Sequence, residues 1–203
     1  MKPTKKHIAD KALILFNEKG FVHVRLQHIA DAAFVSVGHL AYYFRTKEAI
    51  IEYLYDDFRK KQNLVLAEYR FVPLFDDINR YFVAIFNLQS DYIFFYTDAL
   101  EIIRTTPLLH QKYCEYNQWQ FTQLSLLVKF NEARGALVFS KLSNFNHLVE
   151  LLVLKIATWR YAAKTSCIKE ETLSNYVYDL WSSFKPYLTD MGQREFDQME
   201  NVT

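Results

Sequence analysis

Helix-breaking residues are scarce in this chain, and that scarcity constrains its fold more than any other feature of the sequence. Only four glycines and four prolines occur among 203 residues, which favours long helices with few sharp turns. Valine and isoleucine rarely alternate with polar residues, so the signal for half-buried strands is weak. Apolar residues instead recur three and four positions apart. We therefore expect an all-α protein of about nine helices.

Capping residues and the apolar period set the bounds of these helices. Thr4 is placed to cap the first helix, Gly20 to end it, and Ser36 to cap the third. Three short helices come first and longer ones follow. Residues 190–203 are expected to form a frayed or partly ordered tail. The expected helices run from Thr4 to Gly20 and over residues 26–33, 36–43, 47–70, 75–88, 91–105, 108–133, 145–165 and 170–188.

Positive charge is concentrated at the start of the chain. Residues 1–47 contain eight Lys and Arg against three acidic residues, a net charge of +5, while the whole chain carries +1. Residues 48–203 therefore sum to −4. A basic head on an acidic body fits an anionic partner for the head. Chance unevenness over a short segment is the alternative.

Several classes of protein find no support in the sequence. Asp10 and Lys11 interrupt the N-terminal apolar run, so that run is not a signal peptide, and no apolar run approaches the length of a membrane span. The motifs HExxH, GxSxG and ExxH and a Gly-rich phosphate loop are lacking. The two cysteines form no CxxC. We therefore expect a cytoplasmic protein that is not an enzyme and that holds no metal or cofactor.

The stretch "AFVSVGHLAYYF", residues 33–44, places a helix of barely two turns between other helical segments. Leu40 and Phe44 are spaced to point inward, which leaves Gly38 and His39 on the outer side. Two short helices joined by a tight turn are typical of a helix-turn-helix. In that unit, the second helix enters the DNA major groove and its N-terminal residues meet base edges.

The surrounding residues carry a more specific signal. "ALILFNEKGFVHVRLQHIADAAFVSVGHLAYYFRTKEAI", residues 12–50, resembles the N-terminal domain of the TetR/AcrR family of bacterial transcriptional regulators. The family pattern has an "ALxLF" helix ending in Gly-Phe or Gly-Tyr, then "xxIAxxAGVSxGxLYxxFxxKExL". The matching residues are Leu15, Phe16, Gly20, Phe21, Ile29, Ala30, Ala33, Val35, Ser36, Gly38, Leu40, Phe44, Lys47 and Glu48.

This resemblance implies a division of the chain into two domains. Residues 1–47 would form a three-helix, helix-turn-helix DNA-binding domain, and residues 48–203 a larger helical domain for effector binding and dimerisation. Three positions depart from the family pattern. Phe34 stands where the turn usually has Gly, Arg25 where Ser or Thr often caps the second helix, and Ala41 where Tyr is usual. These departures put the base preference in doubt but not the fold.

The DNA surface that we expect combines base-reading and phosphate-binding groups. His39 is placed to reach bases or phosphates, and Gly38 lets the backbone approach DNA, although close packing against a neighbouring helix would also explain a glycine there. Tyrosine hydroxyls suit phosphate oxygens, with partial core packing as the alternative for Tyr43. Lys47 matches the family's phosphate-contacting lysine. The expected DNA-binding residues are Arg25, Gln27, Ser36, Val37, Gly38, His39, Tyr42, Tyr43 and Lys47.

The middle of the chain is rich in aromatic residues, which suits a pocket for an apolar or aromatic effector. Ordinary core packing is the alternative. The expected effector-binding residues are Tyr92, Tyr96, Arg104, Tyr113, Tyr116 and Trp119. Apolar stripes on the last two expected helices predict a homodimer interface, with a monomer as the alternative. The expected interface residues are Leu148, Leu152, Trp159, Leu173, Tyr176, Val177, Leu180, Trp181 and Phe184.

Together these features predict a ligand-responsive transcriptional regulator. We expect a repressor that binds a pseudo-palindromic operator in double-stranded DNA as a homodimer and is released by a small-molecule effector. The alternative is a helical small-molecule-binding protein whose DNA-binding head is degenerate. A helical-bundle enzyme is the third possibility.

Overall fold

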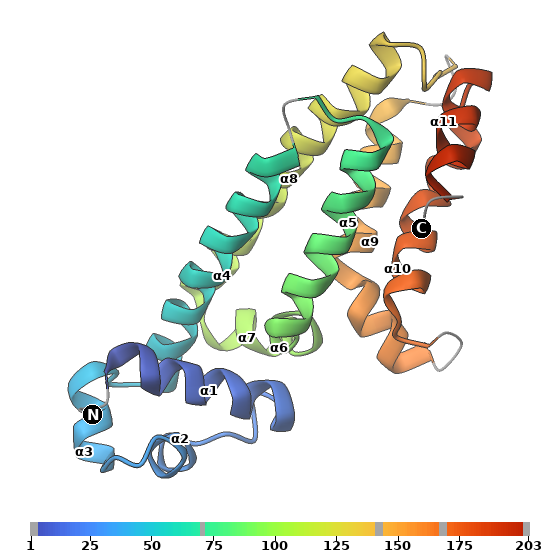
Figure 1. The fold of residues 1–203 in the computed structure, drawn as a ribbon. Helices are drawn as coiled ribbons and strands as arrows, with labels where there is room; N and C mark the ends of the chain where they lie inside the picture. Colours follow the sequence, from blue (N-terminus) through green and yellow to red (C-terminus); the bar gives the residue numbers. More distant parts are fainter. Residues whose placement is uncertain (1–3, 70–71, 141–143, 167–169, 201–203) are drawn as a thin grey trace. The chain divides into compact units, whose positions relative to one another are not determined.

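The computed structural model describes residues 4–69, 72–140, 144–166 and 170–200, and within these ranges the chain is helical (Figure 1). The prediction of an all-α fold is confirmed. None of the described helices is long and apolar enough to cross a membrane. The helices are α1 (Lys5–Lys19), α2 (Leu26–Ala32), α3 (Val37–Tyr43), α4 (Lys47–Tyr69), α5 (Phe75–Asp91), α6 (Phe94–Thr97), α7 (Ala99–Thr105), α8 (Pro107–Ala133), α9 (Phe145–Ser166), α10 (Leu173–Trp181), a 3-10 helix (Lys185–Tyr187) and α11 (Asp190–Glu200).

The chain divides into two compact units. Unit 1 comprises Met1–Asn63 and Leu88–Lys112, and unit 2 comprises Leu64–Asn87 and Tyr113–Thr203. Helices α4, α5 and α8 contribute residues to both units. The boundary at residue 47 is a functional division, which this structural division does not test, and it stays a prediction.

In unit 1, the first three helices form where their caps predict. The Thr4 hydroxyl accepts a hydrogen bond from the backbone N–H of His7 (3.2 Å) and caps α1, which ends at Gly20 with a φ of 77°. The Ser36 hydroxyl accepts from the N–H of His39 (3.1 Å) and caps α3. The apolar residues expected to point inward are buried, among them Ile8, Ala12, Phe16, Ile29, Ala30, Leu40 and Phe44.

Unit 2 contains an aromatic cluster around Trp181. The centre of its ring lies 5.1 Å from that of Phe75, 5.8 Å from that of Phe82 and 5.0 Å from that of Phe184. The indole N–H donates a hydrogen bond to the side-chain oxygen of Asn79 (3.0 Å). Burial of such large rings supplies much of the hydrophobic stabilisation of a helical unit.

Two of the expected helices are divided in the structure. The segment 91–105 contains the short helices α6 and α7, which meet at Asp98. The segment 170–188 contains α10 and then the 3-10 helix, where Pro186 lacks the backbone N–H that a continuing α-helix would use. The described chain therefore has more helices than the sequence predicts, because apolar spacing alone does not reveal short interruptions.

The expectation of a frayed C-terminal tail is wrong for the residues that the structure describes. Helix α11 buries the side chains of Phe196 and Met199. The Glu195 carboxylate accepts a hydrogen bond from the N–H of Phe75 (3.0 Å) and pairs with Arg134 (2.6 Å). Tertiary contacts therefore order a segment that was expected to fray as a chain terminus.

Candidate DNA-binding surface and effector region

Helix α3 is anchored by its apolar side. Leu40 is fully buried and Phe44 is 2% exposed. The ring of Phe44 meets that of Tyr53 edge-on with centroids 5.6 Å apart, and the ammonium of Lys5 lies over both rings at 5.1 and 5.0 Å. Residues of α1 and α4 thus fix the orientation of α3, so that its other side is presented outward.

The outward side of α3 carries the residues expected to read DNA. Val37, Gly38, His39 and Tyr42 are exposed, and Tyr43 is half-buried. The Tyr43 ring meets those of His39 and Tyr42 edge-on, with centroids 5.5 and 5.1 Å apart. The Tyr43 ring therefore joins the other two rings into one small cluster.

Gly38 has open space around it. A Cβ built at this position would meet only the Ser36 hydroxyl oxygen, at 3.9 Å, among the described residues. The alternative explanation by close packing against a neighbouring helix therefore finds no support within the described ranges. The expectation that Gly38 lets the backbone approach DNA closely stays a prediction.

Arg25 and Gln27 lie at the start of α2 and are exposed. The backbone N–H of Arg25 donates a hydrogen bond to His28 Nδ1 (3.2 Å). His28 thus takes the place of the Glu or Gln whose side chain often accepts this bond at the start of a helix. The Gln27 amide donates to the Asp31 carboxylate one turn later (2.7 Å). The Gln27 amide is thus engaged within the helix, and phosphate binding by Arg25 and Gln27 stays a prediction.

Lys47 is engaged within the protein. Its ammonium donates hydrogen bonds to the carbonyl oxygens of Phe21 (2.9 Å) and Val24 (3.1 Å) and lies 3.9 Å from the centre of the Phe21 ring. Burial lowers the pKa of Lys47, although the carboxylates of Glu48 and Glu101 act in the opposite direction. Lys47 thus holds the loop between α1 and α2 and has one N–H left for an external anion.

Asp98 and Asn17, which the sequence analysis did not single out, form further hydrogen bonds near the loop between α1 and α2. The Asp98 carboxylate accepts a hydrogen bond from the N–H of Phe21 (2.5 Å). The Asn17 side chain donates to the carbonyl of Asp91 (2.9 Å) and accepts from the N–H of Phe94 (3.3 Å). No sequence motif marks Asn17 or Asp98, because their partners lie more than 70 residues away in the chain.

The effector candidates are divided between the two units. Tyr92, Tyr96 and Arg104 belong to unit 1, whereas Tyr113, Tyr116 and Trp119 belong to unit 2. Arg104 is exposed, and Tyr96 and the three aromatic residues of α8 are partly buried. The rings of Tyr116 and Trp119 are stacked, with centroids 5.8 Å apart. Their role in effector binding stays a prediction.

Tyr92 is 1% exposed and takes part in a polar cluster. Its hydroxyl donates to the Asp57 carboxylate (2.6 Å) and accepts from the Lys61 ammonium (2.7 Å). Burial raises the pKa of Tyr92 to about 12, and the hydrogen bond to Asp57 acts in the same direction. These bonds tie Tyr92 to α4, which accounts for a buried tyrosine at this position without a ligand.

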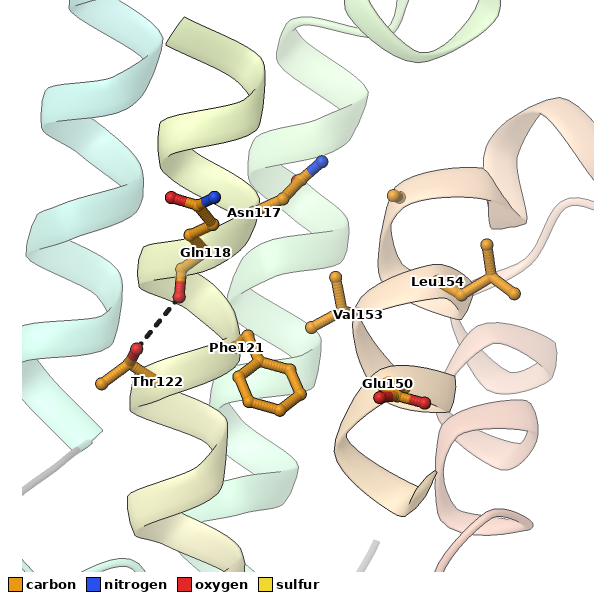
Figure 2. A pocket seen from close by; sticks show the side chains of 8 residues that line it. Asn117, Gln118, Phe121, Thr122, Glu150, Val153 and Leu154 are labelled. Atoms are coloured by element: carbon orange, nitrogen blue, oxygen red, sulfur yellow. Dashed lines mark hydrogen bonds between the residues drawn. The ribbon is translucent and has the colours of Figure 1, made fainter. Parts of the chain in front are cut away.

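A surface groove of about 550 Å³ lies between α8 and α9 in unit 2 (Figure 2). Phe121 of α8 and Val153 of α9 project into the space between the two helices. The groove is lined by Asn117, Gln118, Phe121, Thr122, Glu150, Val153, Leu154 and Ala157. None of the six effector candidates lines this groove.

Most of the residues expected at a dimer interface lie inside the chain's own core. Leu173 is 36% exposed and Val177 is half-buried. The others are buried against the rest of unit 2 and are not available to a partner, namely Leu148, Leu152, Trp159, Tyr176, Leu180, Trp181 and Phe184. The sequence pattern detected apolar faces correctly, but it does not distinguish burial within a chain from burial between chains.

Helices α8 and α9 of unit 2 carry large apolar residues that are exposed. Leu126 of α8 is 60% exposed, and Leu154 and Tyr161 of α9 are 58% and 51% exposed. Leu154 also lines the groove between the two helices. We call these three residues, Leu126, Leu154 and Tyr161, the outer face of α8 and α9.

The fold and the outward-facing α3 define a helix-turn-helix transcriptional regulator. The family model for bacterial regulatory proteins of the tetR family matches residues 8–54, and the TetR model for a bacterial transcriptional repressor matches residues 57–196. The chain therefore belongs to the TetR family, and it is a DNA-binding transcriptional regulator of a non-enzymatic family. The resemblance inferred from residues 12–50 is confirmed.

Individual relatives agree with this family. A probable HTH-type transcriptional regulator from Bacillus subtilis, YttP, is 42% identical over 55 residues, which are 27% of each chain. The structure of a TetR-family regulator from Marinobacter aquaeolei is 26% identical, covers 99% of this chain and 98% of its own, and has a TM-score of 0.87.

A more distant structure shares the fold alone. SmeT, the repressor of a multidrug efflux pump of Stenotrophomonas maltophilia, is 15% identical with a TM-score of 0.64, over 93% of this chain and 92% of its own. SmeT has also been solved in complex with triclosan.

Proposed function

We propose that this chain is a repressor that binds a pseudo-palindromic operator as a homodimer and leaves it when a small apolar or aromatic effector binds. The observation that carries the proposal is α3, anchored by Leu40 and Phe44 and presenting Gly38, His39 and Tyr42 outward. In a helix-turn-helix, such a helix lies in the major groove, and a dimer reads two half-sites about one helical turn apart.

Each group of this surface has a proposed role. His39 and Val37 would read bases, and the hydroxyls of Tyr42 and Tyr43, with the guanidinium of Arg25, would bind phosphate oxygens. Ser36 and Lys47 would act mainly by positioning, since Ser36 caps α3 and Lys47 holds the loop before α2. Gln27 would contact the DNA backbone only if it released Asp31.

The effector step is a shift between two states. An effector releases the repressor only if it binds the DNA-incompetent state more tightly than the competent one. Support for a small, apolar effector comes from SmeT, a repressor of the same fold that binds triclosan. The partly buried aromatic residues Tyr113, Tyr116 and Trp119 of α8, which all belong to unit 2, are the contacts that we propose in this chain, and Tyr96 of unit 1 is a separate candidate.

Selection from a synthetic pool of randomised DNA duplexes tests the DNA-binding function. We expect the wild-type chain to enrich a two-fold-symmetric sequence and to lose affinity steeply with salt, since each phosphate contact adds about 0.9 to the logarithmic slope. His39→Ala should change the preferred bases, because His39 faces outward without stabilising the core. Weak, uniform binding to all duplexes would instead favour the small-molecule-binding alternative with a degenerate head.

The proposed dimer uses the outer face of α8 and α9. Leu126, Leu154 and Tyr161 expose large apolar groups there, and an uncovered apolar surface of this kind commonly marks an interface. Two copies related by a two-fold axis would cover this face with its own counterpart. The buried residues of the expected interface would then support the interface from within.

Leu154→Glu tests the dimer. Burying a carboxylate in an apolar interface is costly, so we expect sedimentation analysis to show monomers and operator affinity to fall. Leu100→Glu is the matched control, because Leu100 is exposed to a similar extent (64%) but lies in α7 of unit 1. A wild-type monomer, or a Leu154→Glu variant that remains dimeric, would contradict the proposal.

A further inference from the structure

Phe34, in the turn between α2 and α3, has an unusual backbone conformation. Its φ is +56°, and no other non-glycine residue within the described ranges has a positive φ. Its N–H donates to the carbonyl of Asp31 (3.1 Å), and the next N–H, of Val35, donates to Ala30 (3.0 Å). These bonds require the left-handed conformation, which glycine adopts freely and a phenylalanine adopts only with strain.

The side chain of Phe34 contributes nothing to the core that would offset this strain. It is 90% exposed, the largest exposed fraction of any large apolar residue described in the chain. Exposed apolar groups also lie nearby in the sequence on α3, since Val37 is 36% and Tyr42 is 81% exposed. A strained backbone that presents an aromatic ring to solvent is a typical sign of a functional contact.

We propose that the Phe34 ring reads the C5-methyl group of a thymine in each half-site of the operator. This proposal rests on the proposed DNA-binding function and adds a base contact to it. Phe34 lies two residues before Ser36, the cap of α3, and so at the end of the helix that meets base edges in a helix-turn-helix.

The chemistry of the ring selects the thymine methyl among the groups in the major groove. A phenyl ring has no hydrogen-bond donor or acceptor, and the other major-groove features of the four base pairs are donors and acceptors. The thymine methyl is the apolar group on a base edge there, and it packs well against a phenyl ring. Phosphate contacts, by contrast, require donors that Phe34 lacks.

Replacing thymine by deoxyuridine removes this methyl and leaves every hydrogen-bonding group in place. The probe is the duplex that the wild-type chain selects from a randomised pool, with each thymine replaced in turn. We expect one symmetric pair of thymines at which the replacement weakens wild-type binding about fourfold per half-site, the effect of burying one methyl group. Phe34→Gly and Phe34→Asn should lose this sensitivity, and Phe34→Tyr should keep it.

The stability of the variants separates a contact from a structural role. Because Gly and Asn accept a positive φ, Phe34→Gly and Phe34→Asn should melt at or above the wild-type temperature while binding the selected duplex less tightly. Ile14→Ala is the control, since Ile14 is exposed (48%) on α1, away from the turn. It should change neither the affinity nor the sensitivity to deoxyuridine.

The possible outcomes distinguish the role of Phe34 from the proposed DNA-binding function. Specific binding by the wild type with unchanged affinity and unchanged deoxyuridine sensitivity in Phe34→Gly would overturn the role of Phe34 and leave the DNA-binding function intact. A lower melting temperature for Phe34→Gly would show that the ring supports the fold, which also overturns the inference. A wild-type chain without a preferred duplex would overturn both the inference and the proposed function.

Discussion

Lys47→Met is expected to lower the free energy of unfolding by about 2 kcal/mol and to weaken binding to every DNA sequence alike. The variant leaves the carbonyls of Phe21 and Val24 without the charged donor that they share, and a hydrogen bond to a charged group contributes about 1.5 to 3 kcal/mol, with partial exposure reducing the loss. The loop that leads into α2 then loses the hydrogen bonds from Lys47 and keeps the one to Asp98.

The salt dependence of binding distinguishes two roles for Lys47. A direct phosphate contact would contribute about 0.9 per subunit to the logarithmic salt slope. We expect Lys47→Met to leave the slope unchanged, because two of the three ammonium N–H groups are bonded to carbonyls within the protein and direct the ammonium toward the loop. Lys60→Met is the charge-matched control, since Lys60 is exposed on α4, and it should change neither stability nor affinity. A slope reduced by about 0.9 per subunit, with stability retained, would show that Lys47 binds phosphate instead.

Gly192→Ala is expected to destabilise the chain by about 3 kcal/mol, the upper end for overpacking a tight contact. A Cβ at this position would lie 2.1 Å from the carbonyl oxygen of Ala136, which is backbone and does not move aside. Helix α11 would have to shift away from the rest of unit 2, with loss of the packing of Phe196 and of the pair between Glu195 and Arg134.

Gly38→Ala is the matched control for this substitution. Both glycines are helical, but the space at Gly38 is open. Alanine should therefore stabilise α3 by about 1 kcal/mol through its higher helix propensity. Urea denaturation of both variants measures the two changes in the free energy of unfolding. We expect these changes to have opposite signs. Equal stabilisation by both substitutions would show that α11 is not packed as described.

The local structure of α3 and its cap is the part of this molecule that the sequence predicts best. Ser36, Leu40 and Phe44 are spaced so that local rules of capping and helical period decide which residues face inward. These rules act over a few residues, and the structure follows them. The strain at Phe34 was predicted only in part. The sequence shows a non-glycine residue in a turn that usually needs glycine, but it does not show that this residue adopts a positive φ.

The expected dimer interface stays a prediction, because apolar stripes do not identify the surface that covers them. Leu148 and Trp181 belong to apolar stripes, and burial of such a stripe stabilises the protein equally whether the covering surface comes from the same chain or from another. The pattern therefore predicts burial but not the partner. The structure places both residues in the core of unit 2, and Leu154, on the same helix as Leu148, is the exposed one.

The sequence by itself determined the class of fold, the register of α1 to α3 and the family, because helical period, caps and the matched residues are all local features. Only the tertiary structure decided what depends on distant partners. Asp98 holds Phe21, Lys47 is occupied by two carbonyls, and α11 is ordered by Glu195 and Phe196. Those contacts join residues far apart in the chain, and no local spacing records them.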